Sequence, residues 1–216
     1  MLMKNPLKIA VLVSGNGSNL QVLIDQMQVG KLPIEIVAVI SNKADAYALT
    51  RAKQASITTF VMDKNPQGKT YPRAEFERLA LNALQPLGVD LVVLAGFMKI
   101  LTPLFINGVQ DELNAPMINL HPSLLPAYKG LHTHERVLKT GDRRHGCSVH
   151  LVTTQLDAGQ VLSQAVLDVG ASDTPATLQN RVHELEYMLL PRTIDFIARG
   201  VIDLTNAGEP IVFMTN

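Results

Sequence analysis

Two residues with hydrogen-bonding side chains, Asn119 and His121, lie at the end of a short apolar run. Side chains two residues apart in an extended strand point to the same face, so an amide and an imidazole would emerge side by side. Pro122 and Pro126 would then end the strand and stiffen the loop that follows. Two donors held in this way could stabilise an oxyanion, as in acyl transfer. The same residues could equally form a capped strand end with a partly exposed histidine.

A second candidate site is the turn Ser-Gly-Asn-Gly-Ser-Asn at 14–19, which follows an apolar run and opens a helical segment. Backbone N–H groups at such a helix start attract anions, and α/β sheets bind ligands at this edge. A dinucleotide site would need a glycine where Leu20 stands and an acidic residue where the chain has Ser41-Asn42. The Gly-Lys-Ser/Thr pattern of a nucleoside-triphosphate loop is also missing. We therefore expect a small phosphorylated substrate, with a tight turn lacking a ligand as the alternative.

Asp157 lies in the segment Leu-Asp-Ala-Gly between two expected strands. By itself it is typical of a turn, because Asp favours such positions. If it lies close to His121, its carboxylate would favour the charged imidazole and could collect a proton, through water, from an attacking amine. Together with Asn119, these residues would support acyl transfer onto an amine without a metal ion or a covalent intermediate.

The segments that would position these residues alternate between strands and helices. Short, nearly all-apolar runs are typical of strands buried on both faces, and the amphipathic segments between them predict helices. The expected strands are 9–13, 34–40, 57–61, 91–95 and 117–120, and the expected helices are 19–28, 45–54, 71–84 and 103–109. This alternation predicts an α/β fold with a doubly wound, mostly parallel, Rossmann-like sheet.

The pattern changes in the second half of the chain, where 146–152 and 161–169 predict an antiparallel strand pair. A long helix is expected from 174 to 199, with Ser172 or Asp173 as its cap, Pro175 in its first turn and Gly200 at its end. We expect a single domain over 1–216, with a core at 8–200 and a small terminal hairpin or tail at 201–216.

Composition narrows the class of protein. The chain has 216 residues, 47% of them hydrophobic and 18% charged, with formal net charge zero. The absence of a basic run argues against nucleic acid as a partner. No apolar stretch has the length of a membrane span, and the one near the N-terminus is too short for a secretion signal. The single Cys147 excludes an internal disulfide and fits a reducing compartment, so we expect a cytoplasmic protein.

Five segments together resemble the phosphoribosylglycinamide formyltransferase family of folate-dependent enzymes. They are Ser-Gly-Asn-Gly-Ser-Asn-Leu, Val-Leu-Ala-Gly-Phe-Met, Asn-Leu-His-Pro-Ser-Leu-Leu-Pro, Gly-Leu-His-Thr-His and Leu-Asp-Ala-Gly. The resemblance implies transfer of a formyl group from 10-formyltetrahydrofolate, as co-substrate, to the amine of 5-phosphoribosylglycinamide. The products would be formylglycinamide ribonucleotide and tetrahydrofolate, in the synthesis of IMP. We expect small-molecule substrates only, no metal, no nucleic acid or membrane partner, and a monomer or weak homodimer.

The resemblance also assigns residues to roles. Asn119, His121 and Asp157 match the family's catalytic trio. The ribonucleotide would be bound by Gly17, Ser18, Asn19, His183 and Glu186. The folate would contact Arg73, Met98, Lys99, Ile100, Leu101 and Asn119, and the loop of Thr153, Thr154, Gln155, Leu156 and Asp157. Lys99, Cys147, Gln160 and His183 replace the family's usual Arg, Thr, Pro and Gln, and none of them is a catalytic group.

Three alternatives to this function remain. A formyltetrahydrofolate hydrolase would carry an additional N-terminal regulatory domain, and a methionyl-tRNA formyltransferase would carry a C-terminal tRNA-binding domain; we expect neither here. A non-catalytic nucleotide or folate sensor would need a broken trio, whereas all three residues are present.

The other histidines are expected to be structural. His132 and His134 are of a residue type that commonly binds metal ions, but residues two apart do not share a helix face. His145 and His150 flank Cys147, and zinc there would still lack ligands. We expect His150 to orient a loop or to lie near the folate.

Overall fold

The computed structural model describes residues 5–206 and 208–214. Contacts within the chain divide it into two compact units, residues 1–118 and 119–216. Strand β5 (Met117–His121) runs from the first unit into the second. The expectation of a single domain therefore stays a prediction. Within the described ranges, no helix is long and apolar enough to cross a membrane.

Unit 1 is built on parallel strands. They are β1 (Leu7–Val13), β2 (Ile34–Ser41), β3 (Thr59–Val61) and β4 (Leu91–Leu94). β1 pairs in parallel with β2 and with β4, and β2 pairs in parallel with β3. The side chains of β4 and those of residues 9–13 of β1 are buried, whichever face they point to. This explains why these strands appear in the sequence as continuous apolar runs.

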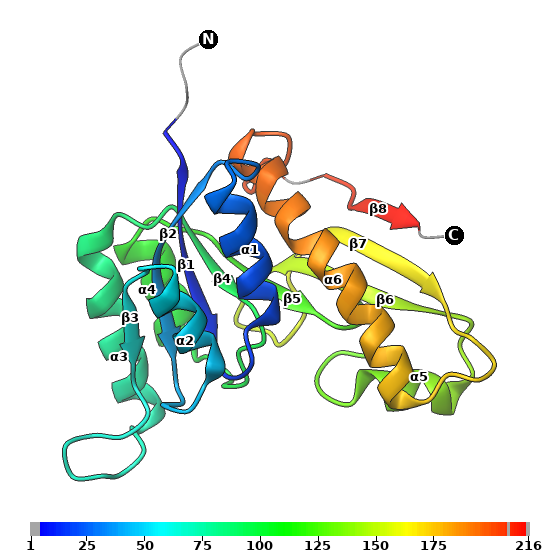
Figure 1. Cartoon of the computed structure of the whole chain (residues 1–216), viewed down its shortest axis with the longest axis horizontal. Helices are drawn as coiled ribbons and strands as arrows, with labels where there is room; N and C mark the ends of the chain where they lie inside the picture. The colour runs from blue at the N-terminus through cyan, green and yellow to red at the C-terminus, as the bar shows by residue number, and fades with distance from the viewer. Residues whose placement is uncertain (1–4, 207, 215–216) are drawn as a thin grey trace. The chain divides into compact units, whose positions relative to one another are not determined.

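The helices of unit 1 pack as two pairs, α1 with α2 and α3 with α4 (Figure 1). They are α1 (Ser18–Gln28), α2 (Tyr47–Gln54), α3 (Arg73–Leu84) and α4 (Pro103–Glu112), with a 3-10 turn at Gln85–Leu87. The chain moves from β1 outward to β3 and then returns past β1 to β4. Because crossovers between parallel strands are right-handed, this reversal places the two helix pairs on opposite faces. It also brings the carboxyl ends of β1 and β4 together, where α/β sheets bind ligands.

Unit 2 contains the antiparallel part of the fold. Its elements after β5 are α5 (Thr133–Thr140), β6 (Arg144–Leu151), β7 (Val161–Asp168), α6 (Pro175–Ala198) and β8 (Ile211–Met214). β6 and β7 are antiparallel, as predicted, and α6 packs on both. A capping box between Thr174 and Thr177 begins α6, with Pro175 as its first residue. Along the sheet the strand order is β3-β2-β1-β4-β5-β6-β7-β8, the mostly parallel α/β arrangement that the sequence predicts.

The cap of α6 is Thr174 and not Ser172 or Asp173 as expected, and two further segments also differ from the sequence-based expectation. α4 extends to Glu112, beyond the expected end at 109, because its last turn is polar and exposed and leaves no apolar signal. In the tail, the described residues contain one strand, β8, which pairs in parallel with β7 instead of forming a hairpin of its own. Pairing with a distant strand edge leaves no local pattern in the sequence.

A buried carboxylate on α3 holds the start of α4. Glu77 accepts a hydrogen bond of 2.7 Å from the backbone N–H of Thr102 and another from the Thr102 hydroxyl. Thr102 precedes the first turn of α4, whose N–H groups have no partners within the helix. The contact fixes one end of the segment 98–101 that was predicted to bind folate.

We expect Glu77→Ala to lower the free energy of unfolding by about 2 to 3 kcal/mol, because hydrogen bonds to a charged group contribute roughly 1.5–3 kcal/mol. Denaturant unfolding measures this change. Glu112→Ala, which truncates an exposed glutamate on α4, is the matched control and should change the value by less than about 0.5 kcal/mol. Equal effects of the two substitutions would contradict a supporting role for the Glu77 contact.

Candidate active site

In unit 1, the turn between β1 and α1 is shaped by a glycine in the left-handed conformation. Gly17 has φ of 73° and precedes the first residue of α1. A Cβ added at Gly17 would lie 2.5 Å from the Cβ of Ala48 on α2, so no side chain fits there. Among the described residues, no side chain caps the N-terminus of α1. The first-turn backbone N–H groups, which include those of the predicted phosphate ligands Ser18 and Asn19, therefore suit an anion.

Arg51 on α2 holds the same turn from outside. Its guanidinium donates to the backbone carbonyl of Asn16 and to the Asn16 side chain, both at 3.0 Å, and to the Gln21 side chain at 3.0 Å. The planar guanidinium thus connects the turn, α1 and α2 through a fixed set of donors. Three of its donors are thus engaged within the protein, and this support holds the backbone of the turn in place.

The hydroxyl of Ser14 joins this turn to the segment 98–101. Ser14 Oγ donates to Asn42 Oδ1 at 2.6 Å and accepts from the backbone N–H of Met98 at 2.8 Å. In that segment the apolar side chains of Met98 and Ile100 are exposed, whereas Lys99 lies over the ring of Phe76. Exposed apolar side chains next to a polar turn suit a flat, partly apolar ligand. Leu101 completes the segment, and Arg73 is the exposed first residue of α3.

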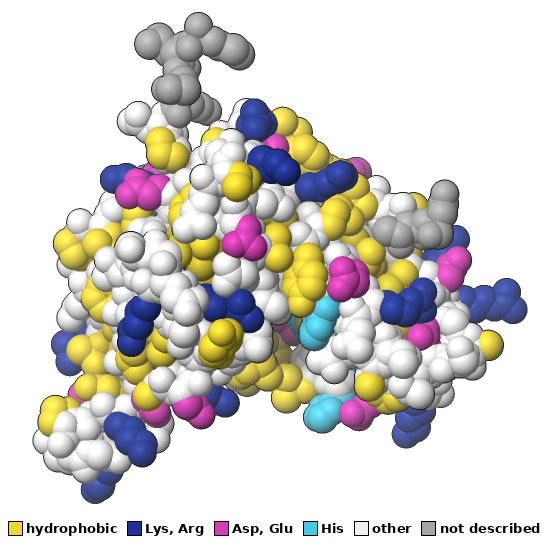
Figure 2. All heavy atoms as spheres, viewed as in Figure 1, with side chains coloured by type: hydrophobic (Ala, Val, Ile, Leu, Met, Phe, Trp, Pro, Cys, Tyr) yellow, Lys and Arg dark blue, Asp and Glu magenta, His cyan; other side chains and the backbone are white. Residues whose placement is uncertain are grey.

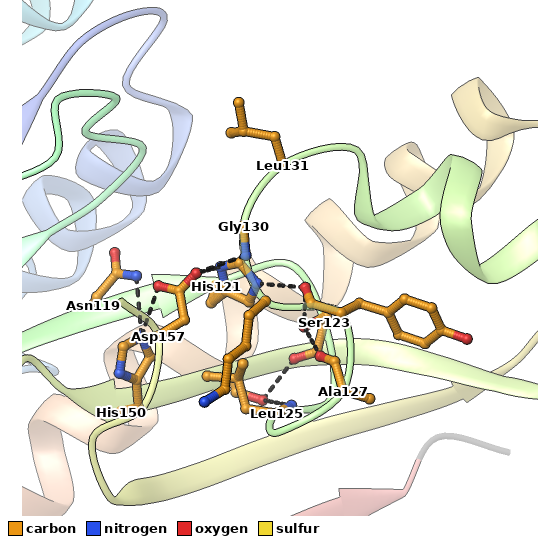
Figure 3. A network of polar contacts seen from close by, with 12 residues as sticks. Asn119, His121, Ser123, Leu125, Ala127, Gly130, Leu131, His150 and Asp157 are labelled. Carbon is orange, nitrogen blue, oxygen red and sulfur yellow. Dashed lines mark hydrogen bonds and ion pairs between the residues drawn. The ribbon is translucent and has the colours of Figure 1, made fainter. Parts of the chain in front are cut away.

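In unit 2, the end of β5 presents Asn119 and His121 as the sequence predicts. The His121 side chain is 7% exposed, and its Nδ1 lies 3.6 Å from Asp157 Oδ2. On its other side, His121 Nε2 lies 3.1 Å from the carbonyl oxygen of Tyr128. Both neighbours are acceptors: Nε2 can donate to the Tyr128 carbonyl, whereas Nδ1 faces the Asp157 carboxylate at a distance longer than a hydrogen bond. Figure 3 shows the His121 ring beside Asp157.

Asp157 is buried and held in place by backbone as well as by side chains. Its side chain is 9% exposed, and its Oδ2 accepts a 2.9 Å hydrogen bond from the N–H of Gly130. Its other oxygen lies 3.8 Å from Nε2 of His150. The residue has φ of 46°, a conformation that Asp tolerates better than most residues. One carboxylate therefore faces two imidazoles (Figure 3).

A set of buried hydrogen bonds fastens the loop between β5 and α5. The hydroxyl of Ser148 on β6 donates to the carbonyl of Ser123 at 2.6 Å and accepts from the N–H of Leu125 at 3.0 Å. Gln164 on β7 donates to the same hydroxyl and to the Leu125 carbonyl, each at 2.9 Å. This fastening fixes the loop that supplies the Tyr128 carbonyl and the Gly130 N–H.

His150 contacts Asn119 directly, a role that the sequence did not assign to it. Its Nε2 lies 3.1 Å from Asn119 Nδ2, and its Nδ1 lies 2.8 Å from the carbonyl oxygen of Leu151. The available signal was the alternation along β6, in which Ser148 and His150 lie two apart and share one face of an otherwise mostly apolar strand. A polar face on a buried strand indicates partners for those groups.

The predicted folate loop, Thr153 to Asp157, is exposed apart from Asp157 itself. Its base is closed by a hydrogen bond from Leu151 N–H to the Gln160 carbonyl. A Cβ on Gly159 would lie 1.8 Å from the Leu151 carbonyl oxygen, so glycine is required there. Gln160, which replaces the family's usual proline, donates from its side chain to the Gly208 carbonyl at 3.0 Å. The substitution therefore ties the loop to the terminal segment.

The remaining ribonucleotide candidates lie on α6. His183 stacks on Tyr187, and Glu186 is buried on the side of α6 that faces Cys147 on β6. Burial and the Glu186 charge raise the pKa of the Cys147 thiol, so this cysteine is an unreactive core residue. The binding roles of His183 and Glu186 stay predictions.

The other histidines form a pair and a surface contact. His134 Nδ1 and His145 Nε2 lie 3.0 Å apart, whereas His132 is exposed and lies 3.4 Å from Glu135. Within the part of the chain that the structure describes, no group of three or more His, Cys, Asp or Glu is arranged to hold a metal ion.

The structure thus brings the predicted catalytic residues Asn119, His121 and Asp157 together within unit 2. Within unit 1, it joins the predicted phosphate turn to the predicted folate segment. That the trio in unit 2 and the two segments in unit 1 act on the same pair of substrates stays a prediction. The fold and the trio define an α/β protein with a polar site suited to acyl transfer.

Comparison with known proteins identifies the class. The chain belongs to the formyl transferase family, whose model matches residues 7–194. It is 43% identical over 198 residues to the phosphoribosylglycinamide formyltransferase of Haemophilus influenzae, which covers 91% of this chain and 90% of that protein. The Escherichia coli K12 enzyme of the same name is 43% identical over 194 residues, covering 90% and 88%. A solved phosphoribosylglycinamide formyltransferase structure from Coxiella burnetii matches with a TM-score of 0.85 and 44% identity, covering 96% of this chain and 99% of that one.

The buried His145 makes the stability of the fold depend on pH. Burial, followed by repulsion from His134 and then from His121, lowers the pKa of His145 to about 4. Between about pH 6.5 and pH 4 the unfolded chain therefore binds a proton that the folded chain does not. Stability should fall as the pH falls through this window, by roughly 1.4 kcal/mol per pH unit for one such proton.

We expect His145→Gln to reduce this pH dependence, because an amide can still contact His134 but does not titrate. Denaturant unfolding at about pH 7 and about pH 5 measures the difference. His132→Gln, at an exposed histidine, is the matched control and should leave the pH dependence as in the unmodified protein. The same slope in both variants would overturn the role of His145.

Proposed function

We propose that this protein transfers the formyl group of 10-formyltetrahydrofolate to the amine of 5-phosphoribosylglycinamide, a step of purine biosynthesis. The products are formylglycinamide ribonucleotide and tetrahydrofolate. Similarity to phosphoribosylglycinamide formyltransferases over nine tenths of the chain supports this function. The observation that carries it is the convergence of Asn119, His121 and Asp157 in unit 2.

The proposed mechanism uses each member of the trio for a separate task. The substrate amine attacks the formyl carbon, and the carbonyl oxygen becomes an oxyanion. The Asn119 amide donates to this oxygen, and charged His121 stabilises it. The Nδ1 of His121 is 3.6 Å from Asp157, longer than a hydrogen bond, so its N–H is not bound by the carboxylate and can donate to the substrate. Asp157 keeps His121 charged and relays the proton lost by the amine.

The second half of the reaction breaks the bond between the formyl carbon and the folate nitrogen. His121 donates a proton to this nitrogen as it leaves, and the proton from the amine replaces it by way of Asp157. The electron pair of the breaking C–N bond stays on the folate nitrogen, so no oxidant is required. General acid–base catalysis of this kind typically contributes about 10²- to 10⁴-fold to the rate.

Substrate binding is proposed for residues in both units. Gly17, Ser18 and Asn19 would bind the ribonucleotide phosphate, which the uncapped start of α1 supports. The glycinamide end would contact His183 and Glu186. The proposed folate contacts are Met98, Lys99, Ile100, Leu101 and Arg73 in unit 1, and Thr153, Thr154, Gln155, Leu156 and Asp157 in unit 2. Exposed apolar side chains in the segment 98–101 support this contact. A cytoplasmic location and a monomeric or weakly dimeric state complete the proposal.

A transfer assay separates this function from its alternatives. We expect loss of the formyl group from 10-formyltetrahydrofolate, followed by folate difference spectroscopy, only when glycinamide ribonucleotide is present. The reason is that the site holds donors for an oxyanion while the amine of the substrate supplies the nucleophile. Equal loss without the ribonucleotide would identify a hydrolase, and no loss in either case would identify a binding protein.

Asn119→Ala and His121→Ala should each lower kcat about 100- to 1,000-fold, because each removes a donor to the transition-state oxyanion. KM for both substrates should change far less. Asn107→Ala, at an exposed asparagine on α4, is the control and should keep full activity. Steady-state kinetics with both substrates measures this, and an effect mainly on KM would make these residues binding groups instead.

A further inference from the structure

His150 lies between two members of the catalytic trio without belonging to it. Its side chain is 3% exposed, and its Nε2 lies 3.1 Å from Asn119 Nδ2 and 3.8 Å from Asp157 Oδ1 (Figure 3). The proposed mechanism gives this imidazole no task. A buried titratable group that touches two reacting residues requires its own explanation.

The partners of His150 define where its proton lies. The Leu151 carbonyl, 2.8 Å from Nδ1, can only accept, so Nδ1 carries a hydrogen. In a neutral ring, Nε2 then has a lone pair and can only accept. The group facing Nε2 is the NH2 of Asn119, which can only donate. The two contacts are therefore satisfied together by one tautomer of the neutral ring.

This tautomer also determines which way the Asn119 amide faces. If the amide were turned over, its oxygen would face the Nε2 lone pair and the two acceptors would repel each other. With the observed orientation, one N–H of Asn119 is bound by His150 and the second is the donor for the substrate oxygen. A donor aimed in advance costs no reorganisation in the transition state.

A protonated His150 would have the opposite effect. Its Nε2 would carry a hydrogen that opposes the N–H of Asn119, and the nearest acceptor for it would be Oδ1 of Asp157. The imidazolium would then compete with His121 for the carboxylate of Asp157. Protonation at this one residue would thus misdirect the oxyanion donor and weaken the support of His121.

The surroundings keep His150 neutral near neutral pH. Burial lowers its pKa, and the positive charges of His121 and Lys129 act in the same direction. The Leu151 carbonyl and the Asp157 carboxylate raise the pKa of His150, but its net pKa is still lowered. These are the charged and titratable groups that face His150 from β5, from the loop before α5 and from the loop before β7.

We infer that neutral His150 is a positioning residue for formyl transfer, which holds the Asn119 amide with an N–H toward the substrate oxygen. This inference rests on the proposed function. It adds a requirement that the trio alone does not contain: the residue behind Asn119 must accept a hydrogen bond and must not carry charge.

Two substitutions at this position separate hydrogen bonding from charge. His150→Gln can accept from Asn119 through its side-chain oxygen, donate to Leu151 and remain uncharged. His150→Leu fills similar space but offers no acceptor. We expect His150→Leu to lower kcat about 100-fold with KM little changed, since a misplaced catalytic group costs about that much. His150→Gln should recover most of this loss. Equal activity of all three proteins, or an equal loss in both variants, would overturn the inference.

The dependence of kcat on pH distinguishes a positioning role of His150 from a merely structural one. In the unmodified protein, kcat should fall as the pH drops through the lowered pKa of His150. His150→Gln lacks this group, so its kcat at low pH, relative to neutral pH, should exceed that of the unmodified protein. His121 and Asp157 are present in both proteins, so the difference between the profiles reports on residue 150. Identical acid limbs would contradict the inference.

The tautomer of His150 can be determined by NMR in the absence of any substrate. Two-bond 1H–15N correlation spectra of labelled protein should show His150 protonated at Nδ1 and not at Nε2 at neutral pH, with the His150 ring assigned through its own backbone resonances in the unmodified protein. A proton on Nε2 would overturn the inference even if both variants failed to fold. Failure of the proposed function is distinct, because the unmodified protein would then release no formyl group in the transfer assay whatever the state of His150.

Discussion

The carboxylate of Asp157 is buried between two imidazoles, and the organisation of unit 2 depends on it. Removing a carboxylate from water is costly unless hydrogen bonds and opposite charge surround it. The Gly130 N–H at 2.9 Å and His121 at 3.6 Å meet this requirement, and neutral His150 at 3.8 Å shields the carboxylate from water. Each partner comes from a different segment, so the carboxylate can be buried only when β5, β6 and both loops are correctly folded. Assembly of the proposed catalytic groups is thereby linked to the folding of unit 2.

Much of this site can be read from local sequence patterns, and the reasons are visible in the structure. Asn119 and His121 were predicted to emerge together because the two-residue period of a strand leaves few alternatives. The turn at Gly17 was predicted because its residue types and its place between a strand and a helix both point to an anion site. Asp157 was different. Its chain segment is an ordinary turn, and only its closeness to His121, 36 positions earlier in the chain, gives it a function; resemblance to a family supplied that information.

What the sequence did not reveal are buried polar groups whose partners lie far along the chain. Glu77, Ser148 and His150 sit in helices and strands whose apolar pattern gives the polar residue no particular meaning. Their importance arises from the groups opposite them, namely the Thr102 N–H, the Leu125 N–H and the Asn119 amide. The same limit applies to β8, since pairing with β7 depends on an open strand edge elsewhere in the fold. The spacing of apolar residues indicates which side of a helix or strand is buried. It does not indicate which group a buried polar atom contacts.

The hydroxyl of Ser14 has a consequence for how two ligands would influence each other. It accepts from Met98 and donates to Asn42, so the turn after β1 and the segment after β4 share a single hydrogen-bond centre. A ligand that orders either segment would reduce the conformational entropy that a ligand of the other segment still has to remove. Thermodynamic linkage makes such an effect reciprocal. Occupancy of the two subsites would then be positively cooperative, with each ligand increasing the affinity for the other while the strands of unit 1 stay where they are.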